Sequence, residues 1–147
     1  MQDLPGRGRY NQHMLTADPA TWDWSRPVFD HVHLRVADVQ ESKRFYQLVL
    51  EPLGLPLMTD TAHFVQFPNF ALSDDRAPTQ GAHVAFTARS REEVIRFHQA
   101  GVDAGFRDNG APGFRDYTPG WYAAYLLDPD GNNIEALFRD APDASGV

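Results

Sequence analysis

Apolar and polar residues alternate from residue 31 to residue 36, which is the period of a half-buried β-strand. Apolar side chains take positions 32, 34 and 36, and the opposite face carries His31, His33 and Arg35. We therefore predict a strand over residues 28–37. One face of this strand lies on a core, and the other faces either solvent or a polar cavity.

The pattern changes to a helical period directly after this strand. Asp38 is a typical N-cap residue, and Glu41 three positions later completes the capping-box spacing. Pro52 and Gly54 end the pattern. The apolar stripe of this predicted helix consists of Val39, Phe45, Tyr46, Val49 and Leu50.

Short apolar runs separated by turn residues follow, and then a second strand and a second helix. Ser90 is the predicted cap of the second helix with Glu93 at the capping-box position, and Gly101 and Gly105 are expected to close it. Residues 107–120 are rich in glycine and proline and are predicted to form a loop. The remaining predicted strands are residues 57–58, 62–67, 70–72, 83–87, 121–127 and 133–138, with a hairpin turn at 128–132.

The chain repeats itself internally. Residues 31–47 align with residues 83–99 at an offset of 52, and six of the seventeen aligned positions are identical. Each copy opens with a histidine at the head of a strand, and the helix cap recurs at the same offset. The repeat predicts an α+β fold of two βαβββ modules, at about residues 28–75 and 81–139. We expect them to form a curved mixed sheet around a metal-binding cavity, with the helices outside.

Composition bounds the class of protein. The 147 residues are enough for one domain with its own core, here 28–139, with an extension at 1–27 and a tail at 140–147. The absence of cysteine excludes disulfides, thiolate metal sites and cysteine nucleophiles. The net charge of −7 argues against nucleic acid and anionic membranes as partners, and no apolar stretch reaches the ~20 residues of a membrane span. We expect a cytoplasmic protein.

Three side chains have the chemistry of a metal site. His31 and His83 take equivalent positions in the repeat, and a pseudo-two-fold relation between modules can bring such positions together. Glu135 lies on the last predicted strand. Two imidazoles and one carboxylate form a facial triad with open positions for substrate and water. We expect a divalent ion (Fe, Mn, Ni, Co or Zn) there, although three unrelated polar positions on a sheet would give the same pattern.

The two ends of the predicted domain resemble the vicinal oxygen chelate superfamily. This superfamily includes glyoxalases, extradiol dioxygenases, fosfomycin-resistance enzymes and bleomycin-resistance proteins. The matching segments are residues 29–32, 36–38 and 42–46 at the opening, and residues 125–135 in the terminal hairpin.

The resemblance has direct implications for fold, cofactor and partner. It covers about residues 28–139 and implies paired βαβββ modules. It places a divalent metal at His31, His83 and Glu135, which match the ligand positions of the superfamily. It also implies a homodimer, since members usually pair, some with modules exchanged between chains.

The chain departs from individual members of the superfamily in three places. Glyoxalase I sites usually have a fourth ligand, a carboxylate from the end of the first module, but residues 64–72 contain no Asp or Glu. Tyr125 matches the tyrosine of extradiol dioxygenases, yet residues 117–119 stand where those enzymes have a histidine. The three-ligand set fits fosfomycin enzymes, but no lysine-rich cation loop is evident. Lyase/isomerase and dioxygenase chemistry therefore both stay open.

His33 and Tyr125 are the candidate catalytic residues. His33 shares a face with His31 and is expected to contact substrate or shuttle a proton; the alternatives are a plain polar sheet position, or the metal ligand in place of His31. Tyr125 is expected to donate a hydrogen bond to a substrate oxygen and stabilise an oxyanion, unless it is simply a packed aromatic. Arg35 and Arg115 are candidates for holding an anionic substrate, although arginine is common on surfaces.

Two functions are consistent with these features. The first is a metal-dependent enzyme whose small substrate chelates the metal through neighbouring oxygens. The second is a binding protein without catalysis, similar to antibiotic-sequestering dimers, which the ten Phe, five Tyr and three Trp would suit. The three candidate ligands favour the enzyme, because binders of that kind usually lack them.

Overall fold

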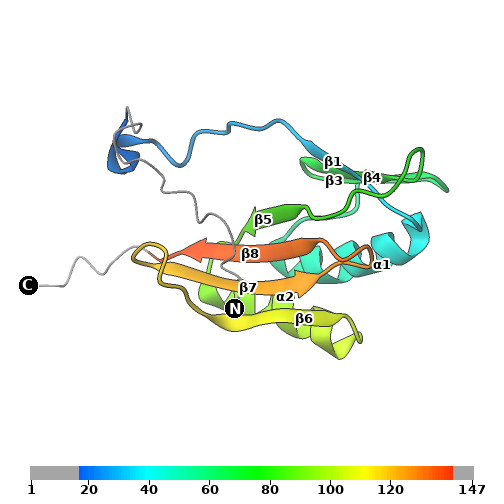
Figure 1. Ribbon diagram of the computed structural model, residues 1–147. Coiled ribbons are helices and arrows are strands. Elements are labelled where there is room, and N and C mark those ends of the chain that lie inside the picture. Colours follow the sequence, from blue (N-terminus) through cyan, green and yellow to red (C-terminus); the bar gives the residue numbers. More distant parts are fainter. Residues whose placement is uncertain (1–16, 141–147) are drawn as a thin grey trace, which may run out of the picture.

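Two mixed four-stranded sheets and two long helices make up the computed structural model, which describes residues 17–140 (Figure 1). Strand, helix and three strands occur in this order twice, which confirms the two βαβββ modules; the strands form two sheets, not one. The elements are η2 (Pro19–Thr21), β1 (Val32–Arg35), α1 (Val39–Leu50), η3 (Glu51–Leu53), β2 (Thr59–Asp60), β3 (Phe64–Phe67), β4 (Phe70–Ser73), β5 (His83–Thr87), α2 (Arg91–Asp103), β6 (Arg107–Phe114), β7 (Trp121–Leu127) and β8 (Asn133–Arg139).

The two sheets share one topology. Their strand orders are β1-β4-β3-β2 and β5-β8-β7-β6. The first strand of each module pairs in parallel with the last one, β1 with β4 and β5 with β8, and the other pairs are antiparallel. β1 and β5 are therefore edge strands, and corresponding positions of the two modules can be compared by register.

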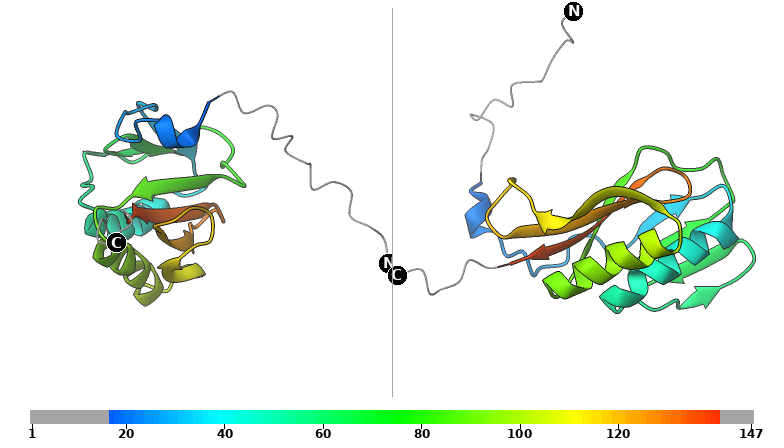
Figure 2. Two further views of the ribbon diagram at one scale, coloured as in Figure 1. Left: turned by 90° about the vertical axis from the view of Figure 1, so that its left-hand side faces the viewer. Right: turned by 90° about the horizontal axis from the view of Figure 1, so that it is seen from below.

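Both helices begin where the capping pattern predicts. The Asp38 carboxylate accepts hydrogen bonds from the backbone N–H groups of Gln40 and Glu41, and the Ser90 hydroxyl accepts one from Glu93. α1 continues into η3 and stops at Gly54, whose φ of +75° suits glycine. The two helices lie side by side (Figure 2); α2 packs on β6, β7 and β8 of the second sheet, and α1 packs on β3 and β4 of the first. None of the helices in residues 17–140 is long and apolar enough to cross a membrane.

One core joins both modules. It contains the buried faces of both helices and the inner faces of both sheets, from Leu34 of β1 to Ala136 of β8. A buried polar contact fastens the modules together, because the Tyr46 hydroxyl of α1 donates to the Asp128 carboxylate at 2.6 Å. Asp128 in turn accepts the backbone N–H of Asn132 and so shapes the β7–β8 turn. The predicted hairpin at 128–132 is confirmed and is anchored on the first module.

The predicted loop at 107–120 is wrong over its first half, where β6 forms. β6 pairs with β7 through two irregularities, between Asp108 and Gly110 and between Gly110 and Gly113. It is an edge strand, which tolerates Pro112 because one side of an edge strand needs no N–H donor. The expectation that Gly101 closes the second helix is also wrong. Gly101 lies inside α2, where an added Cβ would come within 2.4 Å of Leu126 of β7, so its role is close packing.

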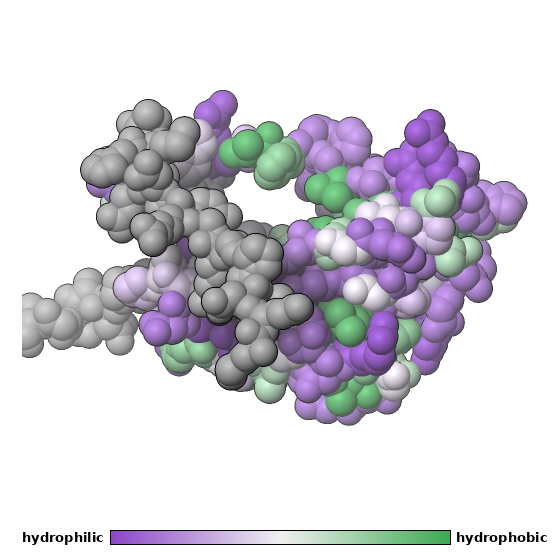
Figure 3. Space-filling view, in the orientation of Figure 1, coloured by the Kyte–Doolittle hydropathy of each residue, from purple (hydrophilic) through white to green (hydrophobic). Residues whose placement is uncertain are grey.

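The segment before β1 runs along the outside of the domain. The predicted extension lies partly outside the described residues, and so does most of the predicted tail. Trp24 contacts Arg139, whose guanidinium carbon lies 4.7 Å from its ring centroid. Val28 and Phe29 are 65% and 79% exposed, and the connection between η2 and β1 forms a hydrophobic stretch on the surface (Figure 3). This stretch lies directly beside the predicted ligand His31.

Candidate functional site

The second sheet brings His83 and Glu135 together. β5 and β8 pair in parallel with Ala85 opposite Glu135, so His83 and Glu135 share the face that points away from the helices. Nε2 of His83 lies 2.8 Å from Oε2 of Glu135. The Glu135 side chain is 2% exposed, whereas that of His83 is 54% exposed. A buried carboxylate and an accessible imidazole therefore form one pair at the surface of this sheet.

Two aromatic side chains of β7 complete the surroundings of Glu135. Trp121 donates its indole N–H to the other carboxylate oxygen, Oε1, at 3.1 Å. Tyr125 lies directly across from Glu135 in the β7–β8 register, and its ring centroid is 6.2 Å from that of His83. Burial, together with the nearby Glu135 carboxylate, raises the pKa of Tyr125 to about 12. Tyr125 is therefore a neutral hydrogen-bond donor at physiological pH.

His31 lies apart from this pair. It precedes β1, and its Nδ1 lies 2.7 Å from the exposed carboxylate of Asp30. It lines a cavity of about 250 Å³ between the two modules together with residues 84–87 of β5. Across residues 17–140, no three His, Cys, Asp or Glu side chains come close enough to hold one metal ion. Within one chain, the predicted ligands His83 and Glu135 therefore lie together with Tyr125, and the third predicted ligand, His31, lies apart from them.

His33 belongs to a separate polar network on the first sheet. Its Nε2 lies 2.8 Å from the Ser73 hydroxyl, which donates to the Asp75 carboxylate at 2.5 Å. Asp75 also accepts from Nε of Arg35 at 3.1 Å. Desolvation and the Arg35 charge lower the pKa of His33. Sequence reasoning missed Ser73 and Asp75, since Ser73 ends, and Asp75 follows, a strand whose pairing with β1 no local pattern reveals.

The β1–β4 pair and the β5–β8 pair occupy equivalent places in the two modules but carry different residues. His33 of β1 stands opposite Ala71 of β4, and Ala85 of β5 stands opposite Glu135 of β8. Because His33 corresponds to Ala85 in the repeat, Ala71 corresponds to Glu135. The missing fourth carboxylate therefore has a defined place in the fold, and a buried alanine occupies it.

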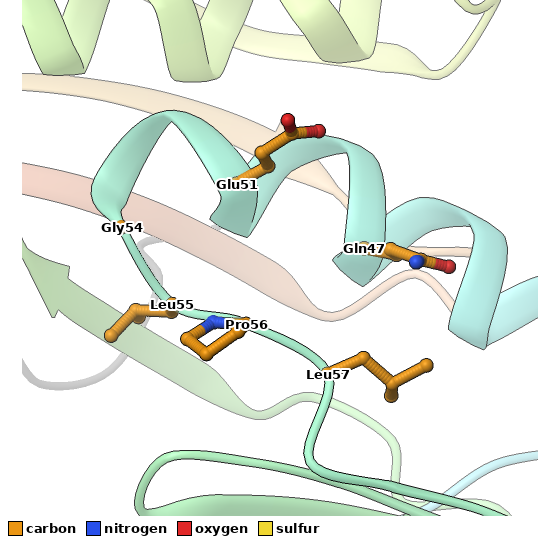
Figure 4. Close-up of a pocket in the computed structure, with 6 residues that line it drawn as sticks. All are labelled: Gln47, Glu51, Gly54, Leu55, Pro56 and Leu57. Carbon is orange, nitrogen blue, oxygen red and sulfur yellow. The ribbon is translucent and has the colours of Figure 1, made fainter.

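Two further cavities differ in whether they lie near the His83–Glu135 pair. One, of about 290 Å³, is lined by Tyr125 and by residues of β6, β8 and the β6–β7 connection. The larger one, of about 500 Å³, lies at the end of α1 between Gln47 and Leu57 (Figure 4). None of the predicted site residues lines the larger cavity, whose one acidic or basic lining side chain is Glu51. The cavity beside Tyr125 is thus the one associated with Glu135.

His83 and Glu135 fit a divalent metal by chemistry and spacing. A first-row divalent ion binds imidazole nitrogen and carboxylate oxygen at about 2.1 Å, which places two neighbouring ligand atoms roughly 3 Å apart. The observed N–O separation is 2.8 Å. The indole of Trp121 restrains the carboxylate from behind, as groups around metal ligands commonly do. A mononuclear site of the predicted type needs one more protein ligand than this pair supplies.

Comparisons with known proteins agree with this architecture. The profile of the Glyoxalase/Bleomycin resistance protein/Dioxygenase superfamily matches residues 28–136. A solved glyoxalase/bleomycin resistance protein from Albidiferax ferrireducens T118 is 35% identical, with 77% of this chain and 100% of that chain covered and a TM-score of 0.69. No curated protein matches the chain.

More distant structures show the fold alone. Lactoylglutathione lyase from Agrobacterium tumefaciens is 20% identical, with 77% of this chain and 94% of that chain covered and a TM-score of 0.58. A glyoxalase/bleomycin resistance protein/dioxygenase from Nocardioides is also 20% identical; it covers 94% of this chain and 95% of its own, with a TM-score of 0.56. The profile match and the 35% identical relative establish that this chain belongs to the glyoxalase/bleomycin resistance/dioxygenase superfamily, the vicinal oxygen chelate superfamily.

Proposed function

We propose that this protein is a metal-dependent enzyme whose ion is held by His83, Glu135 and His31 of the partner subunit in a homodimer. The observation that carries the proposal is the His83–Glu135 pair, with its separation of 2.8 Å and its buried carboxylate. A buried carboxylate without a partner is energetically costly. Buried carboxylates therefore occur where they are paired or bind a metal. A protein that only sequesters ligands in an aromatic groove has no need of this pair.

The position of His31 supports a shared site. It lines a cavity with residues 84–87 of β5, and within residues 17–140 no third His, Cys, Asp or Glu comes close enough to complete a metal site with His83 and Glu135. If Nδ1 of His31 donates to Asp30, Nε2 is left unprotonated, which is the form a metal binds. The exposed Val28 and Phe29 beside it offer apolar area for a second copy. A two-fold axis would then create two equal sites per dimer.

The residues around the pair have separable roles in catalysis. When bound by these residues, a divalent ion would supply Lewis-acid chemistry for a small substrate that chelates metals through neighbouring oxygens. Trp121 orients the Glu135 carboxylate, and Tyr125 donates a hydrogen bond to a substrate oxygen on which negative charge develops. His33 shares a strand face with His31, so the strand that delivers one also delivers the other for proton transfer. Lyase/isomerase and dioxygenase reactions both use this arrangement.

Metal content tests the ligand set. Gently purified protein is analysed for bound Fe, Mn, Ni, Co and Zn before and after incubation with each ion. We expect about one ion per chain in the wild type, and loss of it in His83→Ala and Glu135→Ala. His63→Ala is the control, because His63 is an exposed histidine paired with Asp74. A wild type that binds no ion after reloading refutes the metal-dependent function.

Mixing two defective variants tests whether the site is shared. In a dimer of His31→Ala with Glu135→Ala, one of the two sites keeps all three ligands only if His31 comes from the other chain. Random exchange of subunits would then restore roughly a quarter of the wild-type sites. A site within one chain predicts no recovery, so equal metal content before and after mixing contradicts the shared site.

A further inference from the structure

We infer that the cavity beside Tyr125 binds an anionic group of the substrate through Arg115, so that the substrate combines metal-chelating oxygens with a separate carboxylate or phosphate. This inference rests on the proposed function and adds a substrate class to it. The cavity measures about 290 Å³. Its lining residues are Asn109, Gly110, Arg115, Tyr117, Tyr125 and Asn133.

Two of the residues that line the cavity connect it with Glu135. Tyr125, which forms one wall, stands directly opposite Glu135 in the sheet. Tyr117, on another wall, packs edge-on against Trp121 at 5.4 Å, and Trp121 donates to the Glu135 carboxylate. Two strand spacings separate β6 from β8, which is about 10 Å. One small molecule can therefore reach from Glu135 into this cavity.

The guanidinium of Arg115 is held in place at this cavity. It lies 5.3 Å from the centroid of the Tyr125 ring, in a cation–π contact. Its Nη2 donates to the backbone carbonyl of Ala111 at 2.6 Å, and its Nη1 lies 3.5 Å from that of Phe114. Arginine has five N–H donors, so others are left for a ligand. The contacts fix the position of the charge without neutralising it.

Within residues 17–140, the charge of Arg115 has no acidic side chain as its partner. Among the described residues, no Asp or Glu lies within ion-pair distance of Arg115, although the chain carries 20 acidic side chains and a net charge of −7. The neighbouring amide groups of Asn109 and Asn133 bond to each other at 3.0 Å and add neutral hydrogen-bonding groups. A half-buried cation among amides and phenols is suited to an oxyanion.

β6 is shaped to make room for this arginine. An added Cβ at Gly113 would lie 3.1 Å from Nη1 of Arg115, and one at Gly110 would lie 3.3 Å from Nη2 and 2.8 Å from the Tyr125 ring. The two irregularities of β6 fall at the same glycines. Bulges of this kind often redirect side chains beside active sites. The irregular backbone of β6 therefore accommodates the side chain of Arg115.

Three probes that share a chelating end test the inference. 2-Hydroxyglutarate adds a distal carboxylate, 3-phosphoglycerate adds a distal phosphate, and 2-hydroxybutyrate has neither. Affinities are measured by calorimetry on the metal-loaded wild type and on Arg115→Gln, Arg115→Lys and Arg107→Gln. The last variant removes the same charge from β6, the strand that Arg115 directly follows, at a position outside the cavity.

We expect the wild type to bind at least one of the two distal anions about tenfold or more tightly than 2-hydroxybutyrate. Arg115→Gln should abolish this preference while metal content and the affinity for 2-hydroxybutyrate stay unchanged. Arg115→Lys should retain part of it, and Arg107→Gln should retain it in full. The preferred probe distinguishes carboxylate from phosphate. A wild type without preference, or a preference that survives in Arg115→Gln, overturns the inference.

A failure of the proposed function can be told apart from a failure of this one. If the wild type loads no metal, the metal-free protein is titrated with inorganic phosphate and with glutarate, and the ring signals of Tyr125, which contacts Arg115, are followed by NMR. A perturbation that disappears in Arg115→Gln but persists in Arg107→Gln supports the anion site without the metal. No perturbation by either ion refutes it.

Discussion

The contact between Tyr46 and Asp128 should contribute measurably to stability, because it fastens α1 to the turn that returns β8. Tyr46→Phe removes the hydroxyl and changes little else. The hydroxyl donates at 2.6 Å to a carboxylate that is itself 1% exposed. Burial, followed by the Asp128 charge, raises the pKa of Tyr46 well above its ordinary value, so the group stays a neutral donor. Without it, the Oδ2 atom of Asp128 keeps the Asn132 amide at 3.2 Å.

The magnitude follows from the type of bond. Hydrogen bonds to charged groups contribute about 1.5–3 kcal/mol, and the Asn132 amide is then the one hydrogen-bond donor that Oδ2 keeps among the described residues. For a chain of this length that corresponds to roughly 4–10 °C in Tm. Thermal and urea unfolding followed by circular dichroism measure both quantities. The metal content of Tyr46→Phe should stay close to that of the wild type, since Tyr46 does not touch His83 or Glu135.

Tyr117→Phe is the matched control, because it removes the hydroxyl of a residue that is 67% exposed. We expect its free energy of unfolding to stay within about 0.5 kcal/mol of the wild type. Equal stability of Tyr46→Phe and Tyr117→Phe would refute the reasoning. A double-mutant cycle gives a second test. If Tyr46→Phe and Asp128→Asn lower the free energy of unfolding independently, with no coupling energy between the two sites, the reasoning is also refuted.

Two other substitutions test the packing and the electrostatics of the second sheet. Gly101→Ala should destabilise the protein by about 1–3 kcal/mol in urea unfolding despite the better helix propensity of alanine, because the new methyl would lie 2.4 Å from Leu126; a stabilised variant would contradict the close approach. Tyr125, with a pKa of about 12, keeps its proton in the folded state where the unfolded chain, near 10, loses it, so folding stability falls as the pH rises from 10 to 12 by roughly 2–3 kcal/mol from this group. Tyr125→Phe should flatten that part of the stability–pH curve, and an unchanged slope would show that the Tyr125 hydroxyl is not in this environment.

Local patterns predicted most of the fold because they are read over short stretches. Asp38 and Ser90 cap their helices as their spacing to Glu41 and Glu93 indicates. The repeat then supplied the second module from the first. β6 escaped prediction because glycine and proline weaken a strand signal, and what makes it a strand is its pairing with β7, a tertiary contact.

The site was harder to predict than the fold, because its distances join separate strands. The sequence identified His83 and Glu135, and the parallel pairing of β5 with β8 brings them within 2.8 Å. It gave no sign that His31 lies outside that pair, since equivalence in a repeat does not determine which copy of a module meets which. Trp121 was read only as part of a strand. Trp121 lies four residues before Tyr125 on β7, and its indole N–H reaches Glu135, the residue opposite Tyr125; this contact is visible only after the register is known.

The different residues on the β1–β4 and β5–β8 pairs explain how a duplicated module can build an asymmetric site. A strict duplication would carry the same residues at His33/Ala71 and at Ala85/Glu135, and would face two like groups across the proposed ion. This chain instead has an imidazole on one side and a carboxylate on the other. With Ala71 in place of a fourth carboxylate, the proposed ion keeps one more position open than a four-ligand site would. Ala71 lies opposite His33 in the β1–β4 register, so an imidazole, and not a second carboxylate, is the polar group at this place on the first sheet. In the proposed enzyme, this difference would leave His33, and not a second carboxylate, as the group of this strand pair available for proton transfer.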